Sequence, residues 1–140
     1  MSLLSKVLQV HDRLYKATGG RVGHRLLGVP SLLLSTTGRR SGETRTNSLS
    51  YGRDGADYLV VASKGGSDQP PAWLLNLKAK PEVEIQIGRE RQKAGSKVVE
   101  PSDPDYARLW KIVNENNSDR YTAYQTETSR PIPVVVITPV

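Results

Sequence analysis

The alternation of apolar and polar residues along the chain predicts a largely β-sheet protein. In the clearest run, at 82–87, Val83, Ile85 and Ile87 are separated by charged or amide side chains, as in a strand with one buried face. Apolar and β-branched runs predict further strands at 31–37, 44–51, 58–63, 93–99 and 133–138. The Asp54-Gly55 turn signal separates two of these, so the first three strands are expected to form an antiparallel meander.

Three segments have the spacing of helices instead. Apolar residues between Leu3 and Tyr15 recur at helical spacing until Gly19-Gly20, which predicts an amphipathic helix with a basic polar side. Further helices are expected at 72–79 and 103–114. Strands and helices do not alternate regularly, which disfavours a doubly wound parallel sheet. We therefore predict a mainly β (α+β) fold, a closed or split antiparallel β-barrel with flanking helices.

The length of 140 residues suits one folded unit. We expect an amphipathic N-terminal helical segment at 1–28 and a single barrel domain at 29–140. No apolar run is long enough to span a bilayer, and the N-terminus lacks a signal-peptide pattern, so a cytoplasmic protein is expected. The N-terminal helix packs on the domain in one interpretation, and lies on the inner membrane surface in the other.

The net charge of +6 is unevenly distributed: residues 1–28 carry +4, 29–80 carry +3 and 81–140 carry −1. Such a basic excess suits nucleic acid, an anionic membrane or a polyanionic small molecule. No stacking aromatics are interleaved with the arginines, which argues against a nucleic-acid partner. The chain has no cysteine and only two histidines, His11 and His24, so thiolate chemistry is excluded and no metal site is expected.

The first candidate for chemistry is a glycine-flanked basic loop at 37–42. Arg39, Arg40 and the nearby Arg45 supply donors for phosphate or carboxylate, and the glycines allow close approach. A charged hairpin tip has the same composition, and the loop lacks the spacing of a Walker motif. Anion binding and a solvated turn therefore remain alternatives at this stage.

Three weaker candidates follow along the chain. The run 63–66, Ser-Lys-Gly-Gly, could turn backbone N–H groups towards a ligand. Trp73 and Asn76 are three residues apart and share a helix face, although both also suit a protein core. Tyr121 and Tyr124, with Arg130, lie in a polar stretch that could line a binding mouth. No carboxylate pair suggests acid–base catalysis.

The order and spacing of these motifs resemble the deazaflavin (F420)-dependent nitroreductase family of actinobacteria. The motifs are TTGRRSG at 36–42, RTN at 45–47, RDG at 53–55, ASKGG at 62–66, PAWLLNL at 71–77 and RPIPVV at 130–135. The resemblance implies an FMN-binding split-barrel-like fold and coenzyme F420, whose phosphate and oligoglutamate tail suit the basic excess. FMN on the same barrel is the alternative cofactor.

The resemblance also implies a site and an activity. The implied cofactor-binding residues are Arg39, Arg40, Ser41, Arg45, Thr46, Asn47, Ser48, Leu49, Val61, Ala62, Ser63, Lys64, Ala72, Trp73, Leu75, Asn76 and Tyr121. Tyr121, Tyr124 and Ser50 are the candidates for positioning the acceptor. The implied reaction is hydride transfer from reduced F420 to a quinone or nitroaromatic acceptor, in a protein that could form homodimers.

Overall fold

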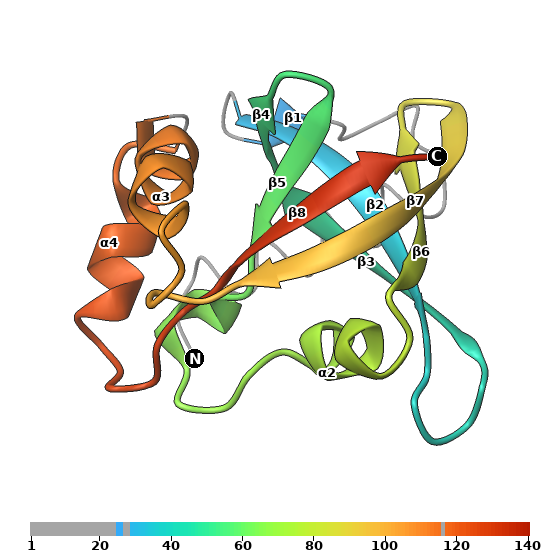
Figure 1. Cartoon of the computed structure of the whole chain (residues 1–140), viewed down its shortest axis with the longest axis horizontal. Coiled ribbons are helices and arrows are strands. Elements are labelled where there is room, and N and C mark those ends of the chain that lie inside the picture. Colours follow the sequence, from blue (N-terminus) through green and yellow to red (C-terminus); the bar gives the residue numbers. More distant parts are fainter. Residues whose placement is uncertain (1–24, 27–28, 116) are drawn as a thin grey trace.

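The computed structural model describes residues 25–26, 29–115 and 117–140, and its strands form one curled antiparallel sheet (Figure 1). Its strands are β1 (Arg25–Leu26), β2 (Val29–Thr37), β3 (Thr44–Ser50), β4 (Gly52–Asp54), β5 (Asp57–Val61), β6 (Glu82–Ile87), β7 (Glu90–Val99) and β8 (Val134–Pro139). Their order in space is β1-β2-β6-β7-β8-β5-β4, and β3 pairs with β2.

The curl arises because β3 and β4 are one nearly continuous stretch of chain, separated only by Tyr51. The first part of this stretch pairs with β2, from Thr44 opposite Thr37 to Ser50 opposite Ser31, whereas β4 pairs with β5. The Tyr51 N–H donates to Pro30 O at 3.1 Å and extends the first pairing. One segment thus links the two ends of the sheet, which confirms the predicted split antiparallel barrel.

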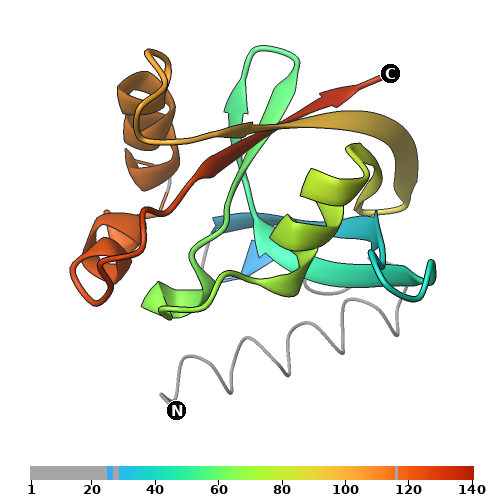
Figure 2. The same cartoon turned by 60° about the horizontal axis from the view of Figure 1, so that its bottom comes forward.

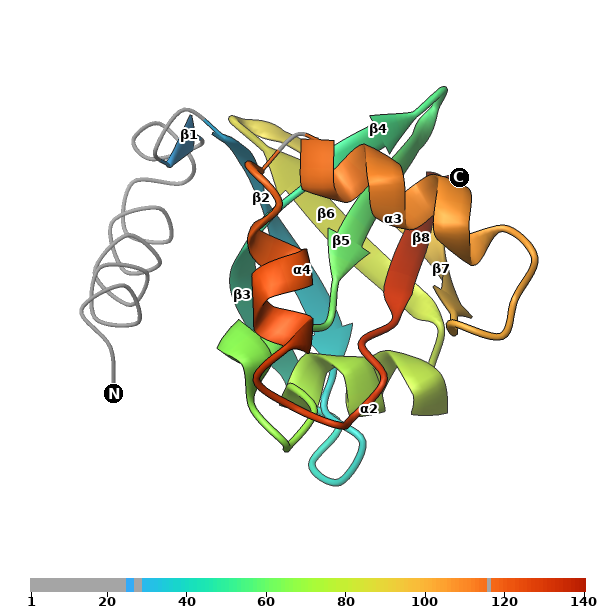
Figure 3. The same cartoon turned by 90° about the vertical axis from the view of Figure 1, so that its left-hand side faces the viewer.

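The barrel has an inner and an outer apolar layer, because its central strands are apolar on both faces. On β5, Tyr58 and Val60 belong to the inner cluster and Leu59 and Val61 to the outer one, as the two-residue period of a strand requires. The outer cluster includes residues of α3 (Tyr106–Glu115) and α4 (Arg120–Gln125). The α3 helix packs against β5 and β8, and α4 packs beside α3 (Figure 3).

The helix α2 (Ala72–Ala79) has the predicted bounds and lies across one end of the barrel (Figure 2). Its residues Leu74 and Leu77 are almost fully buried in the inner cluster. A short 3-10 helix, η1 (Lys64–Gly66), precedes it. The α3 helix begins later than predicted, because the Asp103 carboxylate accepts the Asp105 N–H at 2.9 Å and holds 103–105 in a turn.

Two expectations concern the start of the chain. The predicted helix before Gly19 lies outside the described residues, and Arg25–Leu26 pairs with β2 as the short strand β1. Within the part of the chain that the structure describes, no helix is long and apolar enough to cross a membrane.

Candidate functional site

The basic loop predicted from sequence is a tight connection between β2 and β3. The Gly38 N–H donates to Glu43 O at 2.7 Å, and Ser41 Oγ accepts the Glu43 N–H at 3.1 Å. A Cβ atom at Gly38 would lie only 2.7 Å from Ser41 Oγ and 3.1 Å from Glu43 O. A larger residue at position 38 would displace the Ser41 hydroxyl from its hydrogen bond with the Glu43 N–H, so glycine favours this close approach. The loop thus holds its arginines on a defined backbone.

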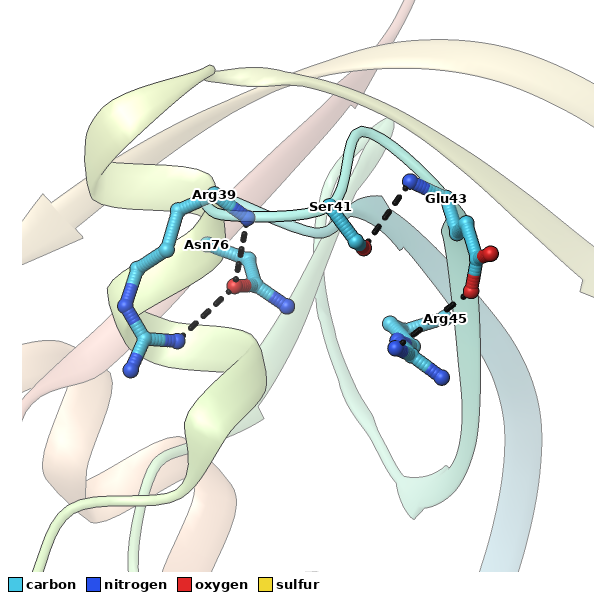
Figure 4. A network of polar contacts seen from close by, with 5 residues as sticks. All are labelled: Arg39, Ser41, Glu43, Arg45 and Asn76. Atoms are coloured by element: carbon cyan, nitrogen blue, oxygen red, sulfur yellow. Dashed lines mark hydrogen bonds and ion pairs between the residues drawn. The ribbon is translucent and has the colours of Figure 1, made fainter.

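Asn76 of α2 attaches this loop to the barrel end (Figure 4). Its side chain is buried, and its Oδ1 accepts hydrogen bonds from the backbone N–H of Arg39 at 3.2 Å and from Arg39 Nη1 at 3.0 Å. Its Nδ2 donates to Thr36 Oγ1 at 3.2 Å. The buried amide thus joins α2 to β2 and directs the guanidinium of Arg39.

The loop, β3 and α2 enclose a cavity of about 550 Å³, which we call the arginine pocket. It is lined by Gly38, Arg39, Arg40, Ser41, Thr44, Arg45, Thr46, Asn47, Ala72, Trp73 and Asn76. None of these described lining residues is acidic. Glu43 pairs with Arg45 at 3.5 Å, but both side chains are largely exposed, so the pair is weak and leaves Arg45 available.

A second cavity of about 390 Å³, the aromatic pocket, adjoins the first. It is lined by Asn47, Ser48, Leu49, Ser50, Val61, Ser63, Lys64, Gly65, Pro71, Ala72, Trp73, Asn117, Arg120, Tyr121 and Tyr124. Asn47, Ala72 and Trp73 line both cavities, so the two form one groove. One end is lined by Arg39, Arg40 and Arg45. The other is lined by Tyr121 and Tyr124, with Lys64 and Arg120 beside them.

The tyrosines of the aromatic pocket are protonated at neutral pH. Burial raises the pKa of Tyr121 to about 12, although hydrogen bonds with the Asn117 and Ser50 side chains act in the opposite direction. Burial also raises the pKa of Tyr124, which the charge of Arg120 partly offsets. Both hydroxyls can therefore donate hydrogen bonds to a ligand, and neither is suited to act as a base.

Arg130 connects two walls of the aromatic pocket without lining it. Its Nε and Nη2 donate to Ser67 O at 3.1 and 3.0 Å, its Nη2 also to Ser63 O at 3.0 Å, and its Nη1 to Ala62 O at 3.2 Å. Gln125 Nε2 donates to the backbone O of Arg130 at 2.9 Å. The Arg130 guanidinium group thereby joins the η1 loop to the segment after α4.

The structure brings most of the predicted site residues into this one groove. Two of them do not line it: Ala62 is fully buried in the inner barrel cluster, and Leu75 lies on α2 outside both pockets. Sequence reasoning missed Asn117 and Arg120. Their only sequence signal is a polar stretch before two spaced tyrosines, which does not show that the stretch folds over a pocket.

Comparison with known proteins agrees with this architecture. The sequence model of the family described as F420H(2)-dependent quinone reductase matches residues 7–139. An F420H(2)-dependent quinone reductase of Mycobacterium tuberculosis is 59% identical over 134 residues, covering 95% of this chain and 90% of that protein.

Two solved structures also resemble the chain. A structure described as an F420-H2-dependent reductase is 35% identical, with a TM-score of 0.68 over 77% of this chain and 93% of that one. A second, described as a domain-swapped dimer, is 32% identical, with a TM-score of 0.70 over 97% of this chain and 99% of that one. The family description refers to quinones, and reduction of nitro compounds stays a prediction. The chain belongs to the F420H(2)-dependent quinone reductase family.

Proposed function

We propose that the groove binds coenzyme F420 with its anionic tail in the arginine pocket and its ring in the aromatic pocket. One observation carries this assignment: three arginines gather at one end of the groove and the aromatic rings gather at the other, and no acidic residue lines it among the described residues. An elongated ligand with a phosphate and carboxylates at one end and a flat ring at the other matches this arrangement.

The arginine pocket fits the tail for two reasons. Arg40 and Arg45 are exposed, and their guanidinium groups can each offer paired donors to a phosphate or carboxylate. Arg39 is already oriented by Asn76, so less conformational entropy is lost when it binds an anion.

When bound, reduced F420 supplies the hydride chemistry of the reaction. The protein positions the two reactants and stabilises charge on the acceptor. Tyr121 is 8% exposed and keeps its proton, so its hydroxyl can donate a hydrogen bond to a quinone oxygen as negative charge develops there. Ser50 and Tyr124 line the same pocket, where they could orient the acceptor.

Two measurements test this function. Titration should show micromolar or tighter binding of oxidised F420 and weaker binding of FMN, because FMN lacks the additional carboxylates that the arginine pocket would hold. The absorbance of F420H2 should then decay when a quinone is added. Absence of F420 binding, or equal affinity for FMN, would contradict the assignment.

The acceptor is the second part of the proposal. We expect a quinone to be reduced in preference to a bulky nitroaromatic compound, because the cavity of about 390 Å³ would hold the cofactor ring as well as the acceptor, and Ser50 and Tyr121 offer hydroxyl donors to a quinone oxygen. Steady-state kinetics with a naphthoquinone and a nitroimidazole would compare kcat/KM directly. A higher value for the nitroimidazole would reverse the assignment of the acceptor.

Assembly and membrane contact complete the proposal. We expect a homodimer, since a relative that is 32% identical over nearly the full chain is described as a domain-swapped dimer. Sedimentation at several protein concentrations would test it, and a monomer throughout would refute it. Contact between the N-terminal segment 1–28 and anionic vesicles is a separate prediction, measured by co-sedimentation with and without that segment.

A further inference from the structure

Asn117 carries a buried hydrogen-bond acceptor that the protein itself does not use. The residue is 4% exposed and lines the aromatic pocket. Its Oδ1 has no hydrogen-bond partner among the described residues. A buried carbonyl oxygen left without a partner destabilises the fold, and such groups are uncommon in native proteins.

The local backbone fixes Asn117 in this position. Its N–H donates to Asn114 O at 3.1 Å, and its O accepts the Arg120 N–H at 3.1 Å. The next two residues, Ser118 and Asp119, have φ values of 53° and 57°, in the left-handed region that non-glycine residues rarely adopt. The chain thus maintains a strained turn directly after the unpaired amide.

Asn114 supports the same turn from α3. Its Oδ1 accepts the backbone N–H of Thr122 at 3.0 Å, and its Nδ2 donates to Trp110 O at 2.9 Å. The backbone O of Asn114 also accepts the Asp119 N–H at 2.9 Å. A buried side chain therefore holds the turn in place, so Asn117 does not owe its position to a loose surface loop.

Opposite ends of the Asn117 amide have different roles. Its side chain hydrogen-bonds with Tyr121, an interaction that stabilises charge on the phenol oxygen and so uses the amide as a donor. The amide carbonyl is then left as an acceptor at the pocket wall. Together, Asn117 and Tyr121 present one acceptor and one protonated hydroxyl to whatever occupies the pocket.

We propose that Asn117 is a specificity-determining residue whose Oδ1 accepts a hydrogen bond from an N–H or O–H group of the molecule in the aromatic pocket. The inference rests on the proposed function, because that function supplies the molecule. The donor is either an N–H of the cofactor ring or a substituent of the acceptor. Sites with buried polar groups discriminate strongly against analogues that leave those groups unpaired.

The first test separates a ligand-binding role from a structural one. Asn117→Leu removes the unpaired carbonyl and keeps a side chain of similar size. The substitution relieves the unpaired carbonyl but also removes the hydrogen bond to Tyr121. Because these effects oppose each other, we expect little change in the urea midpoint of the ligand-free protein, together with about a tenfold loss in binding of a donor-bearing ligand, equivalent to about 1.4 kcal/mol. Asn117→Asp keeps an acceptor oxygen in place and should bind that ligand more tightly than the Leu variant does.

The second test identifies the donor. Binding of oxidised F420 is titrated without acceptor. KM is then compared for 2-amino- and 2-methyl-1,4-naphthoquinone, in which an amino group that can donate replaces a methyl group of similar size. Weaker F420 binding in Asn117→Leu places the donor on the cofactor. A selective rise in KM for the amino compound places it on the acceptor. Thr122→Ala, an exposed change on α4 at a position that lines neither pocket, should alter neither quantity.

Two results would overturn the inference. One is a Leu variant with wild-type affinity for F420 and an unchanged ratio of the two KM values. The other is a urea midpoint that falls in parallel with affinity, which would make Asn117 a structural residue. If the wild-type protein itself failed to bind F420, the proposed function would fall first and this inference with it.

Discussion

Replacing Arg130 with methionine should destabilise the protein and loosen the aromatic pocket. The guanidinium donates four hydrogen bonds to the carbonyl oxygens of Ala62, Ser63 and Ser67. A hydrogen bond that involves a charged group contributes about 1.5–3 kcal/mol, but bonds from one side chain are not additive, and this one is half-buried. We therefore expect a total loss of about 3 kcal/mol in the free energy of unfolding.

Arg108→Met provides a matched control for that experiment. Arg108 forms one exposed ion pair with Asp54 at 2.9 Å, and such surface pairs contribute at most about 1 kcal/mol. Urea denaturation of both variants gives the comparison, and F420 titration shows whether the pocket is affected. An Arg130→Met variant no less stable than Arg108→Met would refute the conclusion that the Arg130 guanidinium group joins the two pocket walls.

Three further predictions address the groove. Changing Arg39 and Arg45 together to Ala should weaken F420 binding about 10–30-fold at low salt and far less near about 1 M salt, measured by titration against the charge-matched Arg89/Lys93 double variant. Because the pKa of Tyr121 is raised to about 12, only the unfolded tyrosine ionises between pH of about 10 and 12. Urea denaturation across that range should therefore show stability falling as pH rises, with Tyr121→Phe removing up to roughly 3 kcal/mol of the loss. Gly66→Ala should cost about 2 kcal/mol in urea denaturation, since φ is +84° and its Cβ would lie 2.8 Å from Tyr124 O.

Each of these three predictions has a contradicting outcome. If the Arg39/Arg45 variant bound F420 as tightly as the Arg89/Lys93 control, the assignment of the cofactor tail to the arginine pocket would be wrong. An alkaline profile unchanged by Tyr121→Phe would mean that the buried phenol ionises normally. A Gly66→Ala variant of wild-type stability would show that η1 and α4 do not pack as closely as 2.8 Å requires.

The sequence predicted those strands and helices that are determined by residues within or next to them. The alternation in 82–87 gives β6, and the prolines at 71 and 81 bracket α2 because each restricts the backbone beside it. The α4 helix escaped prediction, since six mostly polar residues carry no clear apolar period. The pairing of β2 with β6 also could not be predicted, because sequence periodicity does not specify which strands become neighbours.

In the candidate site, too, local features could be predicted from the sequence and long-range contacts could not. Arginines in a glycine-flanked loop suggested an anion site, but nothing in the spacing placed Asn76 against Arg39, 37 residues earlier. The family resemblance implied that both residues belong to the cofactor site, and the structure gives the hydrogen bonds between them. Asn117 was missed by both routes, because its importance depends on burial and on a missing partner, which appear only when α3, α4 and β3 are seen together.

The central claim is that the arginine pocket holds the anionic tail of F420. Its most direct test is to measure dissociation constants of F420, and of the same deazaflavin without phosphate and glutamates, for the wild-type protein and the Arg39/Arg45→Ala variant. The account predicts that the wild-type protein binds F420 about 100-fold more tightly than the tail-less compound, and that the variant loses most of this ratio. An identical ratio in both proteins would contradict it.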